Sequence, residues 1–121
     1  MKKILIIEDD KFLRTLIVRK LIEGGFETAE ADDGEEGLKK IRTEKPDLIL
    51  LDLILPGMDG FEVLAEIKKD PITTLVPIII LSNLGQKEDV EKASEFGVVD
   101  YLIKAHFDPI EIIEKVKKAL K

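Results

Sequence analysis

Four short apolar runs along the chain predict buried β-strands. They cover residues 4–7, 48–51, 77–81 and 98–102. The first three are apolar almost without interruption, which is typical of parallel strands whose two faces are both covered by helices. A fifth run, over residues 26–30, alternates apolar and polar side chains and therefore predicts an edge strand with one face in water.

Amphipathic stretches between these runs predict helices, and most of them carry a start signal. Asp10, Asp33, Asp59 and Asp108 each precede such a stretch as a helix N-cap residue. The last three are followed three positions later by a glutamate, which is the spacing of a capping box. A further helix is expected over about residues 86–96.

The pattern indicates five consecutive strand–helix units, with strand starts roughly 20 to 30 residues apart, the spacing of right-handed crossover connections. It predicts a single α/β domain over residues 1–121, built on a doubly wound, five-stranded parallel sheet. No linker or repeat is visible, so we expect no output domain within this sequence. In such folds, ligands bind at the carboxyl ends of the central strands.

Composition narrows the functional classes. The 121 residues carry 19 Lys and Arg against 25 Asp and Glu, a net charge of −6, and include no cysteine. The acidic balance argues against a nucleic-acid-binding surface, and the lack of cysteine excludes disulfides and thiolate chemistry. No apolar stretch has the length of a signal peptide core or a membrane span. We therefore expect a soluble, cytoplasmic domain.

Charged and polar residues follow the predicted strands at the edge where ligands are expected. They are Glu8 and Asp9 after the first strand, Asp52 after the third, Ser82 and Asn83 after the fourth, and Lys104 after the fifth. Carboxylates that close together repel one another unless a positive charge lies between them. A hard divalent cation with oxygen ligands, above all Mg²⁺, would supply that charge. Asp52 is then a candidate nucleophile that attacks phosphorus and forms an aspartyl phosphate.

Four segments match a known set of motifs. They are residues 4–10 (ILIIEDD) followed by Arg14, residues 46–60 (PDLILLDLILPGMDG), residues 80–82 (ILS) and residues 100–104 (DYLIK). With them, the chain resembles over essentially its whole length the receiver domain of bacterial two-component response regulators. The resemblance implies a flavodoxin-like fold with strand order 2-1-3-4-5. It also implies a phosphorylation-activated switch with at most slow phosphorylation and dephosphorylation activity of its own.

The resemblance assigns the metal and the phosphoacceptor. Asp52 would accept a phosphoryl group from the phosphohistidine of a sensor histidine kinase or phosphotransfer protein, or from a small phosphodonor. Together with Asp52, Asp9 would bind Mg²⁺ directly, Glu8 would bind it through water, and Ile54 would lend its main-chain carbonyl.

The resemblance also assigns the switch. Ser82, Asn83 and Lys104 would contact the phosphoryl group, and the Tyr101 ring would turn inward as the Ser82 hydroxyl moves. The output would be control of partner binding through the face formed by the fourth helix, fifth strand and fifth helix. The domain would act as a monomer or as a phosphorylation-dependent dimer.

Some positions depart from the family pattern. The family usually has proline after its lysine, with a cis peptide bond, whereas Ala105 follows Lys104 here. A cis bond before another residue costs about 3 kcal/mol, so we expect either a trans bond with a rearranged 105–107 loop or a strained cis bond. Asn83 stands where a small residue is usual. Bulky Ile54 and Leu84 flank the path of attacking water, so we expect a long-lived aspartyl phosphate.

Other classes remain open on the sequence alone. A receiver-like module could bind partners without phosphorylation. A haloacid-dehalogenase-type phosphatase also uses an Asp nucleophile with Mg²⁺, but it needs a second Asp as general acid where Ile54 stands. A flavin-binding flavodoxin relative needs a first loop that cradles a phosphate, and the carboxylates of residues 8–10 would repel one.

Overall fold

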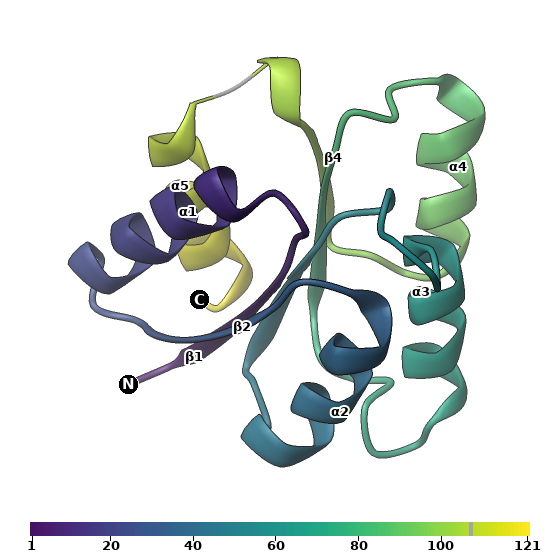
Figure 1. Ribbon diagram of the computed structural model, residues 1–121, viewed down its shortest axis with the longest axis horizontal. Helices are drawn as coiled ribbons and strands as arrows, with labels where there is room; N and C mark the ends of the chain where they lie inside the picture. Colours follow the sequence, from purple (N-terminus) through teal and green to yellow (C-terminus); the bar gives the residue numbers. More distant parts are fainter. Residues whose placement is uncertain (107) are drawn as a thin grey trace.

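The computed structural model describes residues 1–106 and 108–121 (Figure 1). Its five strands and five α-helices confirm the predicted set of elements. The strands are β1 (Lys3–Ile7), β2 (Glu27–Ala31), β3 (Leu48–Leu51), β4 (Ile78–Ser82) and β5 (Asp100–Ile103). The helices are α1 (Lys11–Glu23), α2 (Gly34–Glu44), α3 (Gly60–Lys69), α4 (Lys87–Glu95) and α5 (Pro109–Ala119), with a 3₁₀ helix, η1 (Lys104–His106), after β5.

The largest difference between the predicted and observed strands is at the start of β5. The apolar run begins at residue 98, but the strand begins at Asp100, which pairs with Ile79 of β4. Val99 lies before this ladder and is 52% exposed. The apolar run therefore includes residues that lead into the sheet as well as the strand itself.

The sheet is parallel throughout and has the strand order β2-β1-β3-β4-β5, which confirms the expected topology. The central strands β1 and β3 are in register, with Ile7 paired to Leu51. The following residues, Glu8 and Asp52, therefore leave the sheet side by side. The Asp52 N–H still donates to the Ile7 carbonyl oxygen at 3.0 Å, which fixes this arrangement one residue beyond the strand.

Alternating side chains of the sheet form two separate apolar cores. In Figure 1, α1 and α5 lie on one side of the sheet and α2, α3 and α4 on the other. The core under α2, α3 and α4 contains among others Leu5, Ile7, Ile49, Leu51, Val63, Leu64, Ile78, Ile80 and Ala93. The core under α1 and α5 contains among others Ile4, Ile6, Ile17, Leu21, Leu48, Leu50, Ile79, Ile112 and Val116. Burial on both faces explains why the central strands are apolar almost without interruption.

The four predicted N-caps are present. The Asp10, Asp33, Asp59 and Asp108 side chains each accept a hydrogen bond from a main-chain N–H in the first turn of their helix. The complete capping box is seen at Asp59, whose own N–H is bound by the Glu62 side chain. After Asp33, Oε1 of Glu36 instead lies 3.8 Å from Lys40 Nζ, so an ion pair along α2 competes with a capping box at this helix start.

The Lys104–Ala105 peptide bond is trans, because the described residues contain no cis peptide bond. Of the two expected arrangements, the structure shows the trans bond, followed by the 3₁₀ turn of η1. Phe107, the last residue of the loop that we expected to be rearranged, lies outside the described residues.

Gly60 lets the start of α3 pack directly against the residues that follow β3. A Cβ atom at this position would lie 2.3 Å from Leu53 Cα and 2.6 Å from the main-chain oxygen of Asp52. The Gly60 N–H also donates to the Leu53 carbonyl oxygen at 2.9 Å. Because these neighbours are backbone atoms, they cannot move aside without displacing Asp52.

We expect Gly60→Ala to lower the free energy of unfolding by about 2 kcal/mol, the typical effect of overpacking. Urea denaturation would measure it. Gly85→Ala is the matched control, because a Cβ there meets only the flexible end of Ile103, at 3.2 Å. Equal stability of the two variants would contradict this packing.

Candidate functional site

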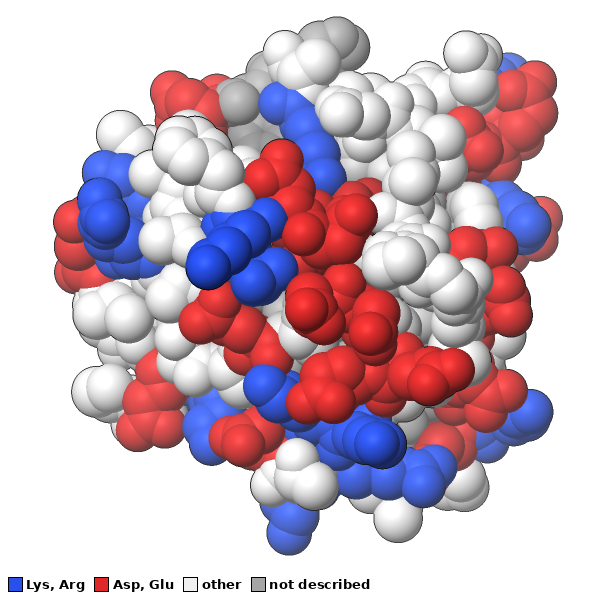
Figure 2. Space-filling view, viewed as in Figure 1, with Lys and Arg blue, Asp and Glu red and all other residues white. Residues whose placement is uncertain are grey.

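Three carboxylates meet at the carboxyl edge of the sheet. Glu8 and Asp9 follow β1 and Asp52 follows β3, and one carboxylate oxygen of each lies within 4.8 Å of the others. Glu8 and Asp52 are only 1% and 4% exposed, whereas Asp9 is exposed. The residues that line the cavity of about 270 Å³ here are Glu8, Asp9, Asp10, Asp52, Ile54, Asn83 and Lys104. Acidic side chains accordingly gather in the middle of the face shown in Figure 2.

Lys104 extends from the end of β5 into this group. Its Nζ lies 2.8 Å from Asp52 Oδ2, to which it donates a hydrogen bond, and 2.5 Å from Glu8 Oε1. The second contact is an ion pair without hydrogen-bond geometry, so Oε1 is a buried oxygen that accepts no hydrogen bond from the described residues. Lys104 thus reaches both Glu8 and Asp52, although Ala105 follows it in place of the proline that is usual in the family.

One ammonium does not fully compensate two buried carboxylates. The pKa of Glu8 is raised to about 7: burial is the main cause and the charge of Asp52 acts in the same direction, against the opposing effects of Lys104 and of the Asp10 N–H. Burial lowers the pKa of Lys104, but its hydrogen bond to Asp52 and its ion pair with Glu8 outweigh this effect and leave the pKa raised. The site therefore favours additional positive charge.

The donor atoms present fit a divalent cation of the Mg²⁺ type. Such ions prefer carboxylate and carbonyl oxygens and usually keep several waters. The three clustered carboxylates offer such oxygens. Asp9 is exposed, which leaves one side of the group open to water.

Asp52 is held by one hydrogen bond at each oxygen. Oδ1 accepts from the Ile54 N–H at 3.1 Å, and Oδ2 accepts from Lys104. Because an ionised carboxylate offers about four acceptor positions, each oxygen keeps capacity for a metal or a reacting phosphorus. The Ile54 side chain is 53% exposed beside the cavity.

Ser82 and Tyr101 are connected through the peptide groups of one residue. The Leu84 N–H donates to Ser82 Oγ at 3.3 Å, and the Tyr101 hydroxyl donates to the Leu84 carbonyl oxygen. Ser82 is fully buried at the end of β4 and does not contribute to the cavity lining. A shift of the Ser82 hydroxyl would therefore alter its hydrogen bond with Leu84, the residue whose carbonyl oxygen binds the Tyr101 hydroxyl.

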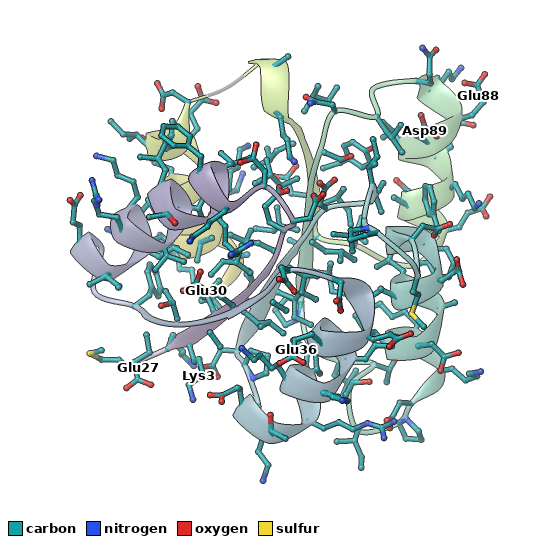
Figure 3. All side chains as sticks on the ribbon, viewed as in Figure 1. Lys3, Glu27, Glu30, Glu36, Glu88 and Asp89 are labelled. Carbon is teal, nitrogen blue, oxygen red and sulfur yellow. The ribbon has the colours of Figure 1, made fainter. Side chains whose placement is uncertain are left out.

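The Tyr101 phenol is shielded from ionisation. Burial raises its pKa to about 12, and the charges of Asp89 and Asp52 act in the same direction. Figure 3 shows Asp89 and Glu88 at the upper end of α4. Of this pair Asp89 is half-buried and Glu88 exposed.

Two connections in this site were not expected from the sequence, although Arg14 itself belongs to the matched motifs. One is the Leu84 peptide, which links Ser82 to Tyr101 through main-chain atoms that any residue type would supply. The other is Arg14, whose Nη1 donates to the Glu8 carbonyl oxygen at 2.7 Å. Its position three residues after the first helical residue is a signal that could have shown it, since such a side chain can turn back toward the strand end. Asp10 acts as a helix cap, as expected, and also lines the cavity.

Comparison with known proteins gives the family. The sequence profile described as the response regulator receiver domain matches residues 4–117. The chain belongs to the response regulator receiver domain family. Receiver domains are generally phosphoacceptor switches rather than true enzymes, and they interact with histidine kinases or phosphotransfer proteins and with downstream effectors.

Individual relatives agree with this assignment. The receiver is 39% identical over 120 residues to PhoP, the alkaline phosphatase synthesis transcriptional regulatory protein of Bacillus subtilis. This alignment covers 99% of the chain and 49% of PhoP. The Mn²⁺-bound form of response regulator Rcp1 is similar with a TM-score of 0.86 and 32% identity, over 98% of this chain and 93% of that one. The BeF3-activated N-terminal receiver domain of Klebsiella pneumoniae RstA is similar with a TM-score of 0.90 and 29% identity, over 99% of each chain.

The receiver spans about half the length of the curated relatives it matches. None of the helices in the described part of the chain has the length and apolar character needed to cross a bilayer.

We expect Lys104→Met to lower the free energy of unfolding in chelator-treated buffer by about 3 kcal/mol, because it leaves two buried carboxylates without their cation. Added Mg²⁺ should then raise the melting temperature more in the variant than in the wild type, since bound metal restores the missing charge. Differential scanning calorimetry measures both effects. Lys115→Met is the control, because it removes a partly exposed cation 3.5 Å from Asp100 and should change little. Equal Mg²⁺ responses in wild type and Lys104→Met would contradict this account.

Tyr101 is the only tyrosine and the chain has no tryptophan, so its ionisation can be followed by absorbance. We expect the native phenol to titrate at about pH 12 rather than at its ordinary value of 10.0. Because the pKa is raised in the folded state, its contribution to stability is complete below pH 10 and is lost as the pH rises toward 12.

Asp89→Asn should move the titration to lower pH, whereas Glu88→Gln on the same helix turn should not. Circular dichroism identifies the pH range in which the fold persists. A titration near pH 10 in the folded protein would show that Tyr101 is not shielded as described.

Proposed function

We propose that this receiver is a phosphorylation-activated switch in which Asp52 is the phosphoacceptor and Mg²⁺ the cofactor. The observation that carries the proposal is the convergence of Glu8, Asp9 and Asp52 around one cavity with Lys104 among them. The phosphodonor would be the phosphohistidine of a sensor histidine kinase or phosphotransfer protein, or a small phosphodonor, and the site would work in the cytoplasm.

The transfer replaces one bond to phosphorus by another. A carboxylate oxygen of Asp52 attacks the phosphorus, the bond from phosphorus to the donor nitrogen breaks, and the donor imidazole keeps the electron pair. Mg²⁺, held by Glu8, Asp9, Asp52 and the Ile54 carbonyl, would neutralise charge on the phosphoryl oxygens. Lys104, Ser82 and Asn83 would contact those oxygens, with Lys104 already directed at Asp52.

The signal would pass from Ser82 to Tyr101 through Leu84. A phosphoryl group can shift the balance between two conformations only by interacting better with one of them. A Ser82 hydroxyl drawn toward the phosphoryl group would give up its bond with the Leu84 N–H, and this would free the loop that also binds Tyr101. The response would appear on the α4-β5-α5 face, where a downstream protein binds.

The lifetime of the signal would depend on the side chains around Asp52. Ile54 lines the cavity and Leu84 is half-buried after β4, so both can screen the phosphorus from an in-line water. No second carboxylate stands two residues after Asp52 to act as a general acid, so we propose slow loss of the phosphoryl group and no rapid turnover.

The same switch could serve two kinds of protein. The curated relative named above, PhoP of Bacillus subtilis, is a transcriptional regulatory protein about twice as long as this chain. We propose that the receiver itself controls a protein partner, whether it stands alone or forms part of such a regulator, and that it contacts no nucleic acid.

Incubation with Mg²⁺ and acetyl phosphate tests the function. We expect mass spectrometry to show one added phosphoryl group on the wild type and none on Asp52→Asn, whose amide cannot attack as a carboxylate does. Chelator should abolish the wild-type signal. Continuous phosphate release would instead favour a phosphatase, and no modification by acetyl phosphate or by a kinase would favour an interaction module that works without phosphate.

A further inference from the structure

Arg14 binds the main chain between two of the clustered carboxylates. Its side chain is only 13% exposed, and it lies in α1, outside the cavity lining. Nη1 donates to the Glu8 carbonyl oxygen at 2.7 Å, and Nε donates to Glu30 Oε1 at 3.0 Å. One guanidinium therefore ties α1 to both the end of β1 and the neighbouring strand β2.

The bound carbonyl belongs to the peptide group that joins Glu8 to Asp9. On its other side, Glu8 is still held by the sheet, because its N–H donates to the Ala31 carbonyl oxygen at 3.0 Å. Arg14 supplies a hydrogen bond to the next peptide group, where the strand has ended. The orientation of this peptide group sets the direction in which the Asp9 side chain leaves the backbone.

Asp9 depends on this backbone more than Glu8 does. Glu8 is anchored through its side chain by Lys104 and by the Asp10 N–H. The Asp9 carboxylate is exposed, and within the described residues it takes part in no hydrogen bond or ion pair. Its place in the cluster therefore rests on the main-chain conformation.

Glu30 lets Arg14 act without repelling a cation at the site. An unpaired guanidinium near the carboxylates would oppose the binding of a divalent ion. Glu30 compensates this charge at 3.0 Å, and its own main-chain oxygen is bound by Lys40. In Figure 3, Glu30 lies between α1 and the β2 ribbon, which is the position needed for this pairing.

We propose that Arg14, paired with Glu30, is a positioning residue for the metal site: it fixes the Glu8–Asp9 peptide group and thereby sets the affinity for Mg²⁺. The inference rests on the proposed function, because it takes the acidic group to be the metal site. Residues that orient metal ligands without touching the ion typically change the affinity by about 10- to 100-fold when they are replaced.

Isothermal titration of unphosphorylated protein with Mg²⁺ tests the proposal. We expect Arg14→Met to raise the Kd by about tenfold or more. Arg14→Lys should also weaken binding, because a single ammonium cannot reproduce the two directed bonds of the guanidinium. Electrostatics alone predicts the opposite sign for Arg14→Met, since loss of a nearby cation would tighten binding. An unchanged or lowered Kd therefore overturns the proposal.

Matched variants distinguish the effect of the bonds that Arg14 makes from the effect of its charge alone. Arg19→Met removes the same charge from an exposed site on α1, and Glu27→Gln removes a carboxylate from an exposed site on β2; neither should change the Kd. Glu30→Gln should weaken binding, and less so at high salt, because it uncovers the charge of Arg14. Equal effects of Arg19→Met and Arg14→Met would overturn the proposal. If Arg14→Met does not fold, Arg14→Lys gives the decisive Kd.

Phosphorylation by acetyl phosphate at varied Mg²⁺ gives a second readout. In Arg14→Met the Mg²⁺ concentration for half-maximal rate should rise, while the rate at saturating Mg²⁺ stays close to that of the wild type. A merely structural role would lower the maximal rate or the stability and leave the Mg²⁺ dependence unchanged. If the wild type binds Mg²⁺ but is not phosphorylated, the proposed function fails, and the calorimetric comparison still decides the role of Arg14.

Discussion

The structure depends on the forced proximity of two buried carboxylates, Glu8 and Asp52. They follow strands that are neighbours in register, so the topology of the sheet places them together whatever the surrounding loops do. Lys104 compensates part of this charge and leaves a deficit of positive charge at a site with one side open to water. The raised pKa of Glu8 and the suitability of the site for a divalent cation are consequences of the same electrostatic constraint.

Leu84 joins Ser82 to Tyr101 through its main chain. Its N–H donates to Ser82 at the end of β4 and its carbonyl oxygen accepts from Tyr101 of β5, so the two bonds involve the two peptide groups that flank one residue. The connection needs no charge and no particular side chain. The buried hydroxyl and the half-buried phenol are therefore connected through main-chain atoms.

The sequence predicts most of the fold because the decisive signals are local. Apolar runs locate the central strands, aspartates locate the helix starts, and parallel topology then brings Glu8 and Asp52 to one edge. The rest depends on side-chain directions and main-chain conformation, which spacing does not encode. Three examples are the reach of Lys104 to Asp52 with alanine behind it, the pairing of Glu36 with Lys40 rather than with the cap, and the direction of Arg14. Each depends on which three-dimensional contact the side chain makes.

The helices that cover one face of the sheet are buried to unequal degrees. Ala93 is the one residue of α4 that is buried, whereas α3 buries Gly60, Val63, Leu64 and Ile67. Most of α4 is therefore free of packing constraints, apart from local contacts such as Lys92 over the Phe61 ring. In evolutionary terms, the exposed residues of this helix can change at little cost to folding. A lineage could therefore alter the proposed α4-β5-α5 face while the strands and the acidic site keep their residues.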